Sequence, residues 1–162
     1  MLRYCSFALL ALGVACDAAS PPSVATPPLP PTLFKPAVTA KQLMDEVIEP
    51  AANVYWDAVG TISDAHGTVE RAPKNNVEWN AVRNAATVVA ESGNLLMMDS
   101  RARNRDEWMA LSRALVDVGE RARAVAESRD TKAVFDVGAD LYQACVNCHA
   151  IYLVGSKATS PP

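Results

Sequence analysis

The chain has 162 residues, a length typical of one domain with short appendages. Half of the residues are hydrophobic and 20% are charged, which excludes a chain that is disordered throughout. The formal net charge of −3 gives no electrostatic reason to expect nucleic acid as a partner. Glycine is scarce, with 7 residues, and alanine is plentiful, so the composition favours helices over sheets.

The first 15 residues have the features of an export signal. Arg3 precedes an apolar or small run over residues 7–15, and small residues follow this run. The run is much shorter than the ~20 residues that a membrane-spanning helix needs. We therefore expect residues 1–15 to be a signal peptide.

The sequence Gly-Val-Ala-Cys that ends at Cys16 resembles a bacterial lipobox. This resemblance implies a lipid on Cys16 and a membrane anchor; ordinary signal cleavage near residues 18–20 is the alternative. Seven prolines lie between residues 20 and 36, and proline excludes a helix or a central strand there. We expect residues 16–37 to be a lipid site followed by an extended, proline-rich tether.

The first helix is expected to begin near Ala40, because Thr39 and Gln42 form a capping-box pattern. Apolar residues then recur every three or four positions as far as Ile62, and the helix is expected to end at residues 66–67. Pro50 lies inside this run and should kink the helix.

Three further helices are expected. They should begin near residues 75–76, near Asn104 and near Asp130, where good N-cap residues precede amphipathic runs. The last of them should end near Gly155.

Helices of this length with mostly short connections predict an all-α fold, an up-down-up-down four-helix bundle. It should span residues 38–157, with residues 158–162 as a tail; an irregular α fold is the alternative.

The candidate functional residues lie in the run Cys145-Val146-Asn147-Cys148-His149, since the other two cysteines lie in or beside the signal. C-x-x-C-H is the attachment pattern of c-type haem. Residues three apart share a helix face, so both thiols can meet one porphyrin edge, and His149 can reach the iron as the proximal ligand. The alternatives are a structural zinc site, a thioredoxin-like redox pair and a strained disulfide.

With these features the chain resembles the class II c-type cytochromes, the family of cytochrome c′ and its low-spin relatives. The resemblance rests on four predicted helices, the C-terminal C-x-x-C-H and Tyr152, three residues after His149. It implies a four-helix bundle with one covalent haem c at one end and electron transfer in the periplasm. Some members bind nitric oxide or carbon monoxide. Many cytochromes c′ have Arg or Lys where this chain has Leu153, a departure that disfavours such a gas-binding pocket.

The sixth iron position decides between these roles. In an up-down-up-down bundle the first turns of the first helix meet the last turns of the fourth. The low-spin family members use a methionine on the first helix, so the resemblance implies Met44 as the distal iron ligand. If Met44 is core filler instead, the iron is open to gases. The candidates expected at this end are Met44, Met97, Met98, Trp108 and Met109.

Arg101, Arg103 and Arg105 should lie at the same end, in the loop between the second and third helices. They are expected either to form a solvated, charged turn or to pair with haem propionates or an acidic partner.

The sequence thus predicts an exported, membrane-tethered electron carrier that docks on redox partner proteins and is not an enzyme. The alternatives are a gas-binding haem protein and a haem subunit of a larger redox complex.

Overall fold

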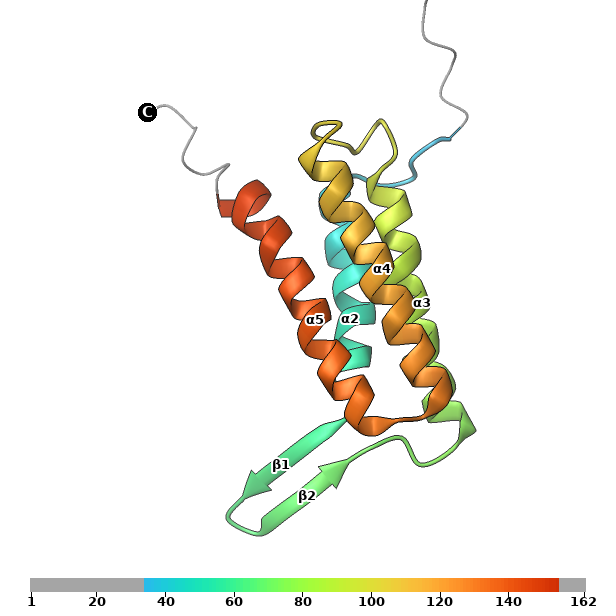
Figure 1. The fold of residues 1–162 in the computed structure, drawn as a ribbon, viewed down its shortest axis with the longest axis vertical. Helices are drawn as coiled ribbons and strands as arrows, with labels where there is room; N and C mark the ends of the chain where they lie inside the picture. The colour runs from blue at the N-terminus through green and yellow to red at the C-terminus, as the bar shows by residue number, and fades with distance from the viewer. Residues whose placement is uncertain (1–33, 155–162) are drawn as a thin grey trace, which may run out of the picture. The chain divides into compact units, whose positions relative to one another are not determined.

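A computed structural model describes residues 34–154, which form helices and one β-hairpin (Figure 1). The protein is therefore mostly α-helical in its described part, and the all-α expectation holds in this coarser sense. The predicted signal peptide (1–15), Cys16 and the predicted tail (158–162) lie outside the described residues. Among the helices that are described, none is long and apolar enough to cross a membrane.

The chain is helical without a break from Ala40 to Trp56. This segment comprises α1 (Ala40–Leu43), the π-helical turn η1 (Met44–Ile48) and α2 (Glu49–Trp56). The predicted capping box is confirmed. The Thr39 hydroxyl accepts a hydrogen bond from the Gln42 amide, and the Gln42 side chain accepts one from the Thr39 amide.

The distortion expected at Pro50 takes the form of the π turn. Pro50 has no amide hydrogen, and its ring crowds the carbonyl four residues earlier. The chain widens just before it, and the Glu49 amide donates to the Met44 carbonyl, five residues back. The helix therefore continues through Pro50 instead of ending there.

The prediction of a helix as far as residues 66–67 is wrong. The helix ends at Trp56, and an antiparallel hairpin follows, formed by β1 (Gly60–Asp64) and β2 (Gly67–Arg71). Gly60 and Gly67 have φ of 153° and 132°, backbone angles that side chains disfavour. Between and after these glycines, β-branched residues favour strands over a helix, namely Thr61, Ile62, Thr68 and Val69.

Three long helices complete the described chain. They are α3 (Asn76–Leu96), α4 (Glu107–Ser128) and α5 (Thr131–His149), which continues as the π-helical η2 (Ala150–Val154). The predicted start of α3 is confirmed, because the Asn75 side chain accepts from two amides of its first turn. The predicted start of α5 is also confirmed, because the Asp130 carboxylate accepts from the Ala133 amide.

The helix expected from Asn104 begins three residues later, as α4. The Asn104 side-chain oxygen accepts hydrogen bonds from the amides of Asp106 and Trp108. Asn104 therefore caps the turn that leads into α4. Its role as a capping residue was predicted correctly, but the helix itself begins three residues later than predicted.

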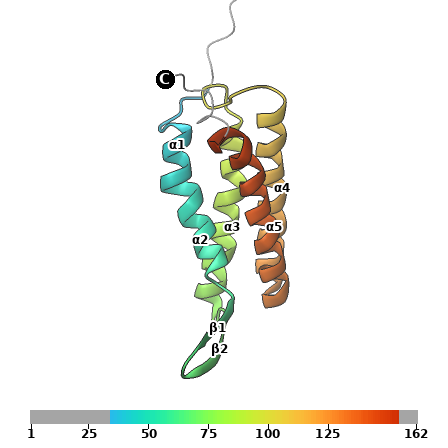
Figure 2. The same cartoon turned by 90° about the vertical axis from the view of Figure 1, so that its left-hand side faces the viewer.

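Successive helical segments alternate in direction along the molecule (Figures 1 and 2). The start of α1, the α3–α4 loop and the end of α5 lie at one end, and the hairpin lies at the other. The closest pair is α3 and α4, which pack along most of their length. A Cβ atom built on Gly119 would lie 2.7 Å from the backbone of Ala90, and one on Gly93 would lie 2.7 Å from the Ser112 carbonyl. These glycines let the two backbones approach each other.

Helix α5 packs along α4 and touches α2 at the hairpin end of the molecule. There the Trp56 indole donates a hydrogen bond of 2.9 Å to the Gly138 carbonyl. Toward its C-terminal end, α5 draws away from the first helical segment (Figure 1). The last turns of α5 therefore pack less closely on the first helical segment than its beginning does.

We expect Gly119→Ala to destabilise the protein by about 1–3 kcal/mol, because the added methyl group would overlap the backbone of α3. The better helix propensity of alanine, about 1 kcal/mol, opposes this loss without cancelling it. The free energy of unfolding in urea measures the effect. Glu120→Ala, at the exposed neighbouring position, is the control and should change stability by less than about 0.5 kcal/mol. Equal stability of the two variants would contradict the close α3–α4 packing.

Candidate functional site

The predicted attachment residues lie in the last turns of α5. Cys145 and Cys148 are free thiols, each half-buried, and His149 is the exposed last residue of the helix. Their spacing of three and four residues puts the two sulfurs and the imidazole on neighbouring positions of one side of α5. These three residues thus lie close together near the end of α5.

Both thiols are in partly apolar surroundings. Burial raises the pKa of the Cys145 thiol above its usual value. Burial also raises the pKa of the Cys148 thiol, and the neighbouring Cys145 adds to this effect. The two side chains are therefore neutral thiols at neutral pH, unlike the thiolate of an activated redox cysteine.

The chain beyond His149 is held against the start of α4. The Tyr152 ring meets the Trp108 ring edge-on, with centroids 4.9 Å apart and planes at 79°. The Tyr152 hydroxyl accepts a hydrogen bond of 2.7 Å from the Asn104 side chain. Trp108 in turn donates a hydrogen bond of 2.8 Å to the Leu96 carbonyl at the end of α3. These contacts fix the end of α5 relative to α3 and α4.

Trp108 lies at this end, as predicted. Its contact with Tyr152 and the Tyr152–Asn104 hydrogen bond were not predicted. The two partners of Tyr152 lie 44 and 48 residues away, and no spacing rule connects residues that far apart.

Large apolar side chains remain exposed around the cysteines. Tyr142 is 61% and Leu153 is 56% exposed, and Val146 and Ile151 are also exposed. Exposed apolar side chains that cluster in this way mark a surface suited to contact with an apolar group or partner. This end of α5 therefore offers apolar contact area next to the two thiols and the imidazole.

The methionines expected at this end differ in their surroundings. Met44 and Met109 are partly buried against the core, and Met97 is the partly exposed C-cap residue of α3. The Met98 sulfur accepts a hydrogen bond from the Arg101 guanidinium at 2.9 Å, which engages one of its two lone pairs. Met44 is also the first residue of the π turn η1.

Of the three arginines expected in a solvated turn, Arg101 is different: it is buried, with 7% of its surface exposed. Arg103 and Arg105 are exposed, and Arg105 forms an ion pair of 2.9 Å with Asp99. The solvated-turn expectation is therefore wrong for Arg101, because its guanidinium binds carbonyl groups of the neighbouring backbone.

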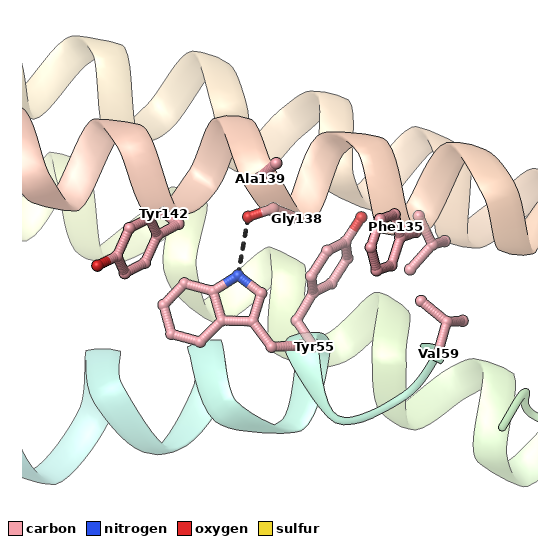
Figure 3. A pocket seen from close by; sticks show the side chains of 8 residues that line it. Tyr55, Val59, Phe135, Gly138, Ala139 and Tyr142 are labelled. Atoms are coloured by element: carbon pink, nitrogen blue, oxygen red, sulfur yellow. Dashed lines mark hydrogen bonds between the residues drawn. The ribbon is translucent and has the colours of Figure 1, made fainter. Parts of the chain in front are cut away.

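A hollow lies nearer the hairpin, between the end of α2 and residues 134–142 of α5 (Figure 3). Trp56 and Tyr142 meet edge-on across it, with ring centroids 6.1 Å apart. The Tyr55 hydroxyl is buried there, and no hydrogen-bond partner for it exists among the described residues. Burial raises the pKa of Tyr55, so the phenol stays protonated across the ordinary pH range. Nothing in the sequence pointed to this hollow.

Within residues 34–154, no three His, Cys, Asp or Glu side chains gather in a group that could hold a metal ion. Haem iron does not need such a group. The porphyrin supplies four nitrogen ligands, and the protein adds one or two axial ligands. The residue set at the end of α5, with two thiols, one imidazole and apolar surroundings, therefore fits a haem.

Comparison with family models, with curated proteins and with solved structures found no match to this chain.

Proposed function

We propose that this protein carries single electrons on one haem c, attached through Cys145 and Cys148 and bound at its iron by His149. The observation that carries the proposal is the C-x-x-C-H run on the last turns of α5, with two free, half-buried thiols beside an exposed imidazole. The exposed apolar side chains nearby and the anchored η2 segment support it.

The chemistry of attachment suits these thiols. Each thiol would add its sulfur to one carbon of a haem vinyl group and its hydrogen to the other, an addition that needs no oxidant. Cys145 and Cys148, three residues apart on a helix, would hold the haem, and His149 would supply an imidazole ligand for its iron.

We propose Met44 as the second axial ligand. Three observations support it. Met44 lies near the start of the first helical segment, which is at the same end as the end of α5 (Figure 2). It begins a π-helical turn, a feature frequent at functional sites. In addition, the sulfur of its competitor Met98 already accepts a hydrogen bond from Arg101. A neutral thioether closes the iron and raises its reduction potential, which suits an electron carrier.

We also propose an architecture and a cell compartment for this protein. The alternating helical segments support an up-down-up-down four-helix bundle of the class II cytochrome type, with the hairpin as an addition between its first two members. Residues 1–15 and Cys16 support export to the periplasm and a lipid anchor. The partners are then redox proteins that reach the exposed end of α5.

We predict one covalent haem per chain. On denaturing gels, haem peroxidase staining should mark a band at the mass of the protein when cells can mature c-type cytochromes. Replacing both Cys145 and Cys148 by Ser should remove this band, because no thioether bond remains. Cys16→Ser is the matched control and should keep the haem. A colourless wild-type protein from such cells would refute the proposed function.

We predict that Met44→Ala opens the sixth iron position. The oxidised wild-type protein should show the weak far-red charge-transfer band of methionine-ligated haem. The variant should lose it, bind carbon monoxide and have a lower reduction potential, because a ligand that favours ferrous iron is lost. Met109→Ala, another partly buried methionine, should keep the band. A high-spin wild-type protein that binds carbon monoxide rapidly would instead favour the gas-binding role.

We predict that Cys16 carries the membrane anchor. Cys16→Ser should move the protein from the membrane fraction to the soluble fraction, because the lipid attachment atom is lost. Intact-mass measurement of the wild-type protein should show cleavage before Cys16 and an added lipid mass. An unmodified N-terminus downstream of Cys16 would refute lipidation and leave the haem assignment unaffected.

A further inference from the structure

A groove lies at the end of the molecule where α1 begins, between residues 36–42 and residues 100–103. One wall is the segment that enters α1, and the other is the α3–α4 loop. No residue of α5 lines it, so it is separate from the proposed haem site.

The groove contains the buried positive charge of Arg101, and within residues 34–154 its hydrogen-bond partners are neutral groups. The Arg101 Nε and Nη2 atoms donate to the Val38 carbonyl at 3.2 and 3.0 Å, and Nη1 donates to the Leu95 carbonyl at 3.1 Å. Nη1 also donates to the Met98 sulfur. None of the ion pairs formed among residues 34–154 involves Arg101. A buried charge without an opposite charge is unfavourable, so the site attracts an anion.

The donors of Arg101 are not exhausted. A guanidinium has five N–H groups, two of them on Nη2. The Val38 carbonyl accepts one of the Nη2 hydrogens, and the other remains for a ligand. The backbone carbonyls also hold the guanidinium in one orientation, so little side-chain entropy is lost when an anion binds.

A second arginine borders the same groove. Arg103 is exposed, and no ion pair within the described residues uses its guanidinium. Ser100, also in the groove wall, adds a hydroxyl. Arg105, two residues further on, is already paired with Asp99 and does not line the groove.

We propose that this groove binds a phosphate group through Arg101 and Arg103. Phosphate carries up to two negative charges and accepts the paired N–H groups of guanidinium, so two arginines match it in charge and geometry. The phosphate has two possible sources, free phosphate and a phospholipid headgroup. The groove wall begins at Pro36, the last proline of the stretch that follows Cys16, so a lipid anchor on Cys16 would hold the chain at a membrane whose phospholipids carry phosphate headgroups.

The test uses the full-length chain with Cys16→Ser, so that a covalent lipid does not itself cause membrane binding. Titration calorimetry with inorganic phosphate measures the first source. Co-sedimentation with phosphatidylglycerol vesicles, compared with phosphatidylcholine vesicles, measures the second. We expect saturable binding in at least one of these arms, and the arm that responds identifies the source.

Arg103→Gln should weaken that binding about tenfold, because a charged hydrogen-bonding group is lost at an exposed position where folding does not depend on it. Arg105→Gln is the matched control. It removes the same charge from the same loop, but from an arginine outside the groove, and should leave the affinity within about twofold. Arg101→Gln should abolish binding if the variant folds; if it does not fold, Arg103→Gln decides the question. Absence of binding in both arms, or an equal loss in Arg103→Gln and Arg105→Gln, would overturn the proposal.

Discussion

The indole of Trp108 joins the ends of three helices, and the geometry of the candidate site depends on it. Its N–H donates to the Leu96 carbonyl at the end of α3, and its ring meets Tyr152 beyond the end of α5, while Trp108 itself lies in the first turn of α4. Trp108 is buried, so these contacts form where water does not compete. The C-x-x-C-H run ends three residues before Tyr152 and is thereby held at a fixed position relative to the rest of the helices.

The helices differ in how fully neighbouring helices cover them, and the candidate site lies on a less covered helix, α5. Helices α3 and α4 meet so closely that Gly119 lies against the backbone of Ala90. Helix α5 packs mainly on α4, and Val146 in its last turns stays exposed. A closely packed pair of helices beside a partly uncovered one suits a protein that holds a large apolar group at its surface. The proposed haem would supply the missing contacts of α5 and place one porphyrin edge within reach of a redox partner.

Arg101 forms a second set of polar contacts at the same end of the molecule. Arg101 ties the segment that enters α1 to the α3–α4 loop through the Val38 carbonyl. It therefore holds in place the first turn of the helix that contains Met44. It also donates a hydrogen bond to the sulfur of Met98. Arg101 thus contacts both the groove proposed to bind phosphate and one of the methionines at this end.

The sequence by itself determined the features that depend on neighbouring residues. The capping residues Thr39, Asn75 and Asp130 act within one helical turn, so each helix start they predicted is present. The C-x-x-C-H spacing likewise defined the thiols and the imidazole as one group, because helix periodicity alone decides which positions are adjacent. Three other features were not predicted. The apolar spacing that predicted a helix runs as far as Ile62, whereas Gly60 and Gly67, with positive φ, and the β-branched residues beside them form a hairpin. The burial of Arg101 and the anchoring of Tyr152 depend on segments 44 or more residues apart, whose approach is decided by the packing of the whole chain.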